Sequence, residues 1–191
     1  MTDHPALSAT YPIARAAFRA AADAAGATVH TFEHPLRGPE GESLGIDVAE
    51  LGPRDAATVV LVVSATHGVE GYCGSALQTQ WLTHHAGERP HQLRLVNIHA
   101  LNPYGMAWVR RVNEDNVDLN RNFRTFEPPP EPHRAYADVH EFIVPATWPP
   151  TAENEARLAA YAQAHGPMAL QTAVSGGQCE FPDGIFYGGA R

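Results

Sequence analysis

The sequence predicts an α/β protein, namely a three-layer sandwich in which helices flank a mixed, largely parallel sheet. An apolar, β-branched run at 59–63, VVLVV, is typical of a strand buried on both faces. A second apolar run follows at 93–100, LRLVNIHA, after a helical segment that could serve as the crossover between two parallel strands. With 191 residues, 44% of them apolar, the chain is long enough to bury a sizeable core, and we expect one domain over 1–191.

The amino-terminal part predicts one helix and two strands before the buried run. An alanine-rich helix is expected over 8–26, because Gly26 is suited to end it and Ser8 or Thr10 to cap its start. Its apolar face is predicted to carry Ile13, Ala17, Ala20 and Ala24. Strands are predicted at 28–34, which alternates, and at 43–51.

The remaining elements are mostly helical. The segment 71–85 predicts the crossover helix, with Ala76, Leu77, Gln80 and Trp81 packing on the sheet and Cys73 as a small buried residue. Further helices are expected at 136–144 and 152–165, the latter opening at Thr151. The apolar segment 168–174 fits either a helix or a strand, and the glycine-rich end of the chain reads as a loop.

Charge and composition exclude several classes of partner. The net charge of −8 and the absence of a basic run argue against nucleic acid. No stretch approaches the roughly 18 apolar residues of a membrane span, and no secretory signal opens the chain. Two cysteines without C-x-x-C spacing fit a reducing compartment, so we expect a cytoplasmic protein without a membrane partner.

Two metal-capable side chains, His67 and Glu70, stand just after the run 59–63, in the string THGVEG. Ligands of open α/β sheets bind outside the carboxyl ends of such strands. A catalytic zinc takes three protein ligands and keeps one position for water, and this H-x-x-E string could supply two of them. The same string also fits a solvated loop histidine beside a glutamate at a helix N-terminus.

A second string, NPYGMAWVRRVNEDNVDLNRNF at 102–123, makes the pattern specific. With the first string, it resembles the zinc carboxypeptidase superfamily, which includes carboxypeptidases and the succinylglutamate desuccinylase and aspartoacylase group. The similarity is closest to a branch of uncharacterised bacterial proteins with THGVEG and DLNRNF. On its own, DLNRNF would also fit an Asx-rich turn that closes with a buried phenylalanine.

The resemblance implies a role for each matched residue. His67 and Glu70 would be zinc ligands, Arg111 would polarise the scissile carbonyl as the catalytic arginine, and Asn120 and Arg121 would bind a substrate carboxylate. A guanidinium suits both arginine roles, because it grips carboxylates bidentately and stabilises developing negative charge. The implied partner is a small molecule or peptide with a free carboxylate.

The chain departs from the superfamily pattern downstream. The pattern requires a third zinc ligand, a histidine, and a catalytic glutamate, both beyond a G-G-Q…P-x-G-[IL]-F-Y-G-G segment. Here that segment is 176–189, and the chain stops two residues later at Arg191, so we expect the amino-terminal portion of such a catalytic domain. The most credible substitute ligand within the chain is His99. Two donors hold zinc weakly.

Three functions are compatible with these residues. The first is a zinc-dependent carboxypeptidase-type hydrolase that cleaves an amide bond next to a free carboxylate. The second is an N-acyl amino acid deacylase of the aspartoacylase type, whose usual first motif has asparagine where this chain has Val69. The third is a non-catalytic remnant that binds carboxylates without turnover.

Overall fold

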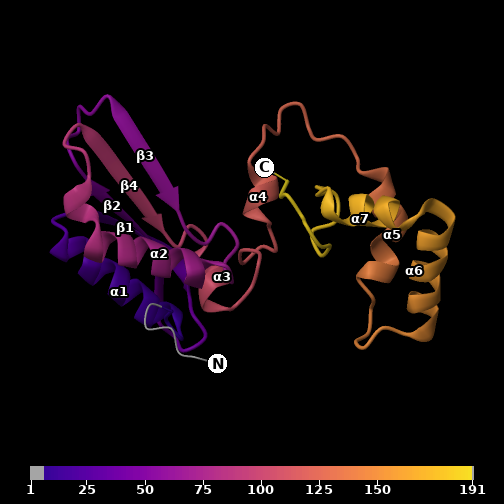
Figure 1. Ribbon diagram of the computed structural model, residues 1–191. Helices are drawn as coiled ribbons and strands as arrows, with labels where there is room; N and C mark the ends of the chain where they lie inside the picture. The colour runs from indigo at the N-terminus through magenta and orange to yellow at the C-terminus, as the bar shows by residue number, and fades with distance from the viewer. Residues whose placement is uncertain (1–6, 191) are drawn as a thin grey trace. The chain divides into compact units, whose positions relative to one another are not determined.

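A computed structural model describes residues 7–190 of the protein, and these form two compact units that divide between Glu114 and Asp115. Figure 1 labels the helices and strands of both units. The single domain over 1–191 stays a prediction.

The first unit contains a four-stranded mixed sheet. The strands β1 (Thr28–Arg37), β2 (Ser43–Leu51), β3 (Thr58–Val63) and β4 (Leu93–His99) lie in the order β1-β2-β4-β3. The α/β class with a mixed sheet and flanking helices is confirmed. Parallel pairing is confined to β3 and β4, because β2 pairs antiparallel with both β1 and β4, so the sheet is less parallel than the sequence predicted.

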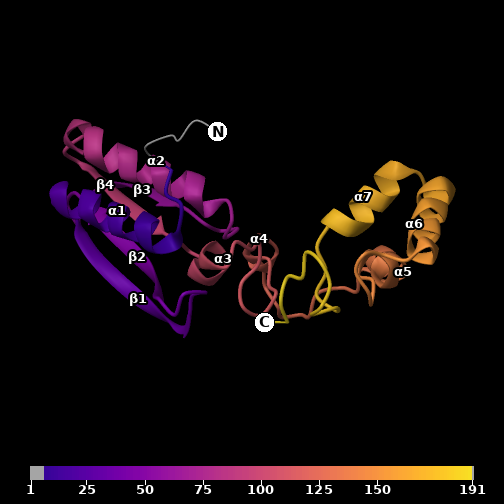
Figure 2. The ribbon, with the colours of Figure 1, turned by 90° about the horizontal axis from the view of Figure 1, so that it is seen from below.

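Two long helices, α1 (Tyr11–Ala24) and α2 (Gly71–His84), lie side by side on one face of this sheet (Figures 1 and 2). The helix α2 connects β3 to β4 as the predicted crossover. The polar side chains of Ser75 and Gln78 are buried on it, whereas Leu77 is 67% exposed and Cys73 is exposed, so the predicted packing of Leu77 and the buried position of Cys73 are wrong.

The strand β3 is not buried on both faces, and this prediction is wrong. Among the described strands it lies at the end of the sheet, paired only with β4. Its aliphatic side chains are between 37% and 59% exposed. Those that face α2, Val60 and Val62, line an open apolar groove with Leu77 and Trp81 of that helix. The apolar run at 59–63 therefore forms a strand with apolar faces, but the edge of β3 away from β4 has no described neighbouring strand.

The buried face of α1 is carried by residues other than the predicted ones. Tyr11, Ala14, Phe18 and Ala21 are buried, whereas Ile13 is 54% exposed. The two aromatic rings are seven residues apart, which places them on one side of a helix, two turns from each other. The helix begins after Thr10, whose side chain makes no capping hydrogen bond.

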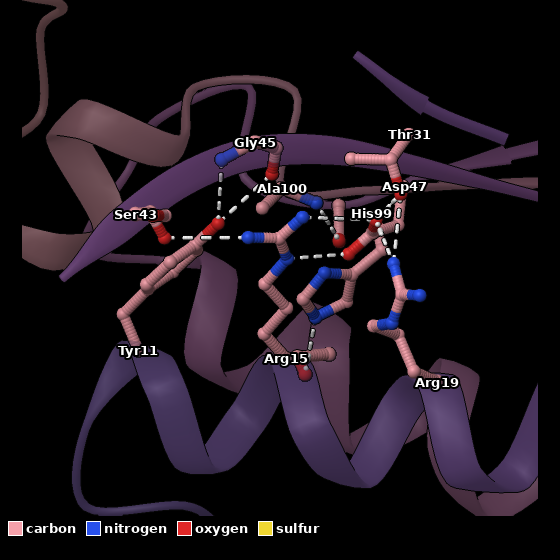
Figure 3. Close-up of polar contacts among 11 residues, drawn as sticks. Tyr11, Arg15, Arg19, Thr31, Ser43, Gly45, Asp47, His99 and Ala100 are labelled. Atoms are coloured by element: carbon pink, nitrogen blue, oxygen red, sulfur yellow. Dashed lines mark hydrogen bonds and ion pairs between the residues drawn. The ribbon is translucent and has the colours of Figure 1, made fainter. Parts of the chain in front are cut away.

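A buried ionic network joins α1 to the sheet (Figure 3). The fully buried carboxylate of Asp47 accepts hydrogen bonds from Arg15 (2.7 and 3.1 Å), Arg19 (2.8 Å) and Thr31 (2.6 Å). Burial alone would raise the pKa of Asp47, but these hydrogen bonds and the two guanidinium charges outweigh it, and the pKa is lowered. The carboxylate is therefore fully satisfied and stays ionised.

The second unit is helical. It contains α4 (Leu119–Asn122), α5 (Arg134–Ile143), α6 (Ala152–His165) and α7 (Pro167–Ser175), and Val139, Phe142 and Ala173 form its core cluster. The predicted start of α6 is confirmed, because the Thr151 side chain accepts a hydrogen bond from the Asn154 N–H. The ambiguous segment 168–174 is helical. Across residues 7–190, no helix combines the length and apolar character that a membrane crossing needs.

Candidate active site

The backbone between β3 and α2 is tied to the end of β4. Ser64 and Ala65 follow β3, and their carbonyls accept hydrogen bonds from Leu101 and Asn102, both 3.0 Å long. Ala65 and Ala100 both adopt left-handed backbone conformations, with φ of +58° and +57°. Such conformations cost non-glycine residues about 1–3 kcal/mol each and concentrate at functional sites.

Gly68 allows the His67 loop to contact the segment after α3 (Pro103–Ala107) closely. The N–H of Gly68 donates to the Arg111 carbonyl (3.2 Å), and the N–H of Val69 donates to the Arg110 carbonyl (2.9 Å). A Cβ atom at Gly68 would lie 2.0 Å from the carbonyl carbon of Gly105, where no side chain fits. Only glycine therefore permits this loop to lie against α3.

The N-P-x-G string has a structural role in this arrangement. The Asn102 side chain caps α3 by accepting a hydrogen bond from the Gly105 N–H (2.8 Å). Its amide nitrogen also approaches the Arg111 carbonyl at 3.5 Å. Asn102 thus links the end of β4 to the segment that carries Arg111.

Three of the predicted site residues, His67, Glu70 and Arg111, meet in the first unit. His67 Nδ1 lies 3.2 and 3.1 Å from the two carboxylate oxygens of Glu70. The Arg111 Nη1 lies 3.5 Å from Glu70 Oε1. The His67 side chain is 11% exposed, whereas that of Glu70 is 64% exposed, so the carboxylate stands at the surface above a mostly buried imidazole.

The separation of the two donors fits a shared zinc ion. Ligands about 2.1 Å from zinc at tetrahedral angles are about 3.4 Å apart, close to the His67–Glu70 distances. In the part of the chain from 7 to 190, no group of three or more histidine, cysteine, aspartate or glutamate side chains is arranged to hold a metal. The described residues thus offer two donors at this point.

A second H-x-x-E string shows that this contact alone does not identify a site. His85 and Glu88 have the same spacing, and His85 Nδ1 lies 3.1 Å from Glu88 Oε2. The His85 side chain is 53% exposed, however, and it follows a helix rather than a strand. His67 differs in its burial, in the left-handed backbone of Ala65 two residues before it, and in the neighbouring Arg111.

His99 is excluded as a substitute ligand by its surroundings. Its ring is fully buried and stacks on Phe18 with centroids 4.4 Å apart. Its Nε2 lies 2.8 Å from the Ser75 hydroxyl. Burial lowers the pKa of His99 to about 4, so the imidazole is neutral at pH 7. His99 therefore belongs to the core between the sheet and the two long helices.

The other two predicted residues, Asn120 and Arg121, lie on α4 in the second unit. Asp118 caps this short helix by accepting a hydrogen bond from the Asn120 N–H (2.9 Å). Arg121 donates from Nη2 to the Ser175 carbonyl (3.0 Å). Phe123 is 100% exposed, so the alternative of a turn closed by a buried phenylalanine is wrong.

Comparison with known proteins gives the family of this chain. Residues 7–191 match the family described as "Protein of unknown function (DUF2817)". No sequence among curated proteins matches the chain. Among solved structures, the glutaminyl cyclase of Fimbriiglobus ruber is similar at 16% identity and a TM-score of 0.33, over 44% of this chain. The chain spans 35% of the length of that structure.

Proposed function

The chain belongs to the DUF2817 family, and we infer that it carries the metal-binding and oxyanion-binding part of a carboxypeptidase-type hydrolase. The observation that carries this proposal is the grouping of His67, Glu70 and Arg111 beyond the ends of a parallel strand pair, where Ala65 and Ala100 adopt left-handed backbone conformations. An imidazole, a carboxylate and a guanidinium are the groups that metal-assisted amide hydrolysis uses.

His67 and Glu70 would hold the zinc ion through Nδ1 and the carboxylate. Zinc at this point would supply a Lewis acid that activates water for attack on an amide carbonyl. The protein fixes the imidazole in place through its burial and through the hydrogen bonds of Gly68 and Val69. Because two donors hold zinc weakly, the expected affinity is well below that of a three-ligand site.

Arg111 would stabilise the oxyanion of the substrate. Its guanidinium is permanently charged, its side chain is 37% exposed, and its backbone carbonyl is tied to Gly68. A fixed donor of this kind lowers the barrier by several kcal/mol when it faces developing negative charge. Asn120 and Arg121 would bind the free carboxylate of the substrate, through the amide and the guanidinium fork.

A zinc titration of paired variants tests the metal site. Calorimetry on the full chain should show zinc binding that is at least about tenfold weaker in His67→Ala. The matched control is His85→Ala, which removes the other H-x-x-E histidine and should leave the affinity within about twofold. Equal affinities in the two variants would remove the proposal.

Substrate comparison separates the alternative functions. With zinc present, the carboxypeptidase type predicts hydrolysis of short peptides with a free carboxyl end, and the deacylase type predicts hydrolysis of N-acyl amino acids instead. Zinc binding without turnover of either substrate would leave the carboxylate-binding remnant as the function. In each case activity should depend on Arg111, with Arg110→Gln as the control, because Arg110 contacts the ring of Tyr104 rather than Glu70.

A further inference from the structure

A small cavity in the second unit is lined by two arginines. Arg121 and Arg124 share this space of about 240 Å³ with Asn120, Gly177 and Cys179. None of the described residues that line the cavity carries a carboxylate, and no ion pair between residues 7 and 190 involves either arginine. In a chain with a net charge of −8, two guanidiniums that share one cavity and pair with no carboxylate of the described residues form a concentrated positive site.

Arg121 is held in place by the loop that follows α7. Its Nη2 donates to the Ser175 carbonyl (3.0 Å), and its guanidinium lies 5.4 Å from the centre of the Phe186 ring. Gly177 adopts φ of +83°, and a Cβ atom there would lie 2.6 Å from the Arg121 Cδ. The glycine thus lets the arginine stem lie against the loop, and the guanidinium is oriented before any ligand arrives.

Arg124 keeps most of its hydrogen-bonding capacity. Its Nη1 approaches the Cys179 sulfur at 3.5 Å, and sulfur is a weak acceptor. The position of Cys179 is fixed by its buried neighbour Gln178, whose carbonyl accepts a hydrogen bond from the Gly188 N–H (2.7 Å). A carboxylate that enters the cavity can therefore replace a weak contact of Arg124 with a charge-assisted one.

We propose that Arg124 acts with Arg121 in this cavity to select ligands that carry two carboxylates. This proposal rests on the proposed function, which assigns one substrate carboxylate to Asn120 and Arg121. A single carboxylate would neutralise one guanidinium and leave the second charge unmatched. The cavity has the volume of about eight water molecules, which suits a short dicarboxylate. Arg124 is thus a specificity-determining residue.

A binding comparison tests the proposal with two five-carbon acids. Glutarate carries two carboxylates and pentanoate carries one, and both are titrated into the full chain while the side-chain N–H signals of its arginines are followed by NMR. A chelator is present, so the result does not depend on the metal site at His67. Glutarate should bind at least about tenfold more tightly than pentanoate.

Variants assign this preference to Arg124. In Arg124→Gln the preference for glutarate should fall below about twofold, with pentanoate affinity unchanged, whereas Arg121→Gln should weaken both acids. Arg134→Gln is the matched control, because Arg134 is exposed on α5 and does not line the cavity. Retention of the preference in Arg124→Gln would overturn the proposal.

Two further outcomes separate this proposal from related ones. Inorganic phosphate binding at least about tenfold more tightly than glutarate would overturn the dicarboxylate assignment. Loss of zinc binding or turnover would overturn the proposed hydrolase function without touching the glutarate preference, because the two assays use different residues and conditions.

Discussion

The Gly68→Ala substitution tests whether the contact between the His67 loop and α3 builds the candidate site. The new methyl carbon would lie 2.0 Å from the Gly105 carbonyl carbon and 2.2 Å from the Met106 nitrogen. Carbon contacts are comfortable at about 3.5 Å, so the two backbones must separate by about 1.5 Å. Since the obstructing atoms belong to the main chain, no side-chain rotation can relieve the overlap.

The expected cost follows from the interactions that this separation removes. The hydrogen bonds from Gly68 and Val69 to the 110–111 backbone would be lost, at about 0.5–1.5 kcal/mol each. Overpacking of a close contact adds about 1–3 kcal/mol. We expect the free energy of unfolding to fall by about 4 kcal/mol in total, the middle of a range of about 2–6 kcal/mol.

Urea unfolding followed by circular dichroism measures this change, and Gly87→Ala provides the control. Gly87 lies in the short 3-10 helix Ala86–Glu88, inside the other H-x-x-E string, and a Cβ atom there meets nothing within 4 Å. Gly87→Ala should change stability by less than about 1 kcal/mol. If Gly68→Ala and Gly87→Ala agree within about 0.5 kcal/mol, the contact does not hold the site as argued.

Two further predictions concern the sheet. Burial lowers the pKa of His99 from 6.5 to about 4, so the folded state binds its proton less readily than the unfolded state, and the stabilisation present above pH 6.5 is lost as the pH falls to 4. The loss is on the order of 3 kcal/mol. Between pH 6.5 and 4, the free energy of unfolding should depend less on pH in His99→Gln than in the wild type. The exposed control His30→Gln should keep the wild-type slope. If His99→Gln shows the same slope as His30→Gln, the prediction is wrong. On β3, Leu61 is 59% exposed, so Leu61→Ala should cost less than about 1 kcal/mol, against about 3 kcal/mol for Leu82→Ala on the buried side of α2. Equal losses in urea unfolding would show that β3 is covered in solution.

The sequence predicted the elements better than it predicted their burial. The strands β2 and β4 and the helix α6 fall within one residue of their predicted bounds, because alternation, apolar runs and a Thr151 cap are local signals. The exposure of β3 could not be predicted in this way. An apolar run specifies a strand that pairs, but which strand lies beside it is decided by topology.

The predicted buried faces of the helices were wrong for a different reason. Alanines occupy so many positions of α1 that several helical faces are equally apolar in the sequence, and the pattern predicts the face through Ile13. The large aromatic side chains of Tyr11 and Phe18 mark the correct face more clearly than the alanines do, and both are buried. On α2, Gln78 faces the sheet because its amide nitrogen donates to the Val62 and Ile98 carbonyls at 3.2 and 3.1 Å. A hydrophobic pattern gives no weight to a buried glutamine.

The sequence predicts the candidate site only because its donors are accompanied by other residues. Both H-x-x-E strings bring histidine and glutamate to about the same distance, so the two letters carry little information by themselves. Gly68 and Gly105 distinguish the first string, because a Cβ atom at either position would overlap neighbouring atoms. A loop that depends on two glycines to lie near an arginine is specified far more narrowly than a histidine at a helix end. The glycines therefore argue for the site as strongly as the donors do, and they predict that Gly68→Ala weakens zinc binding even though it removes no ligand.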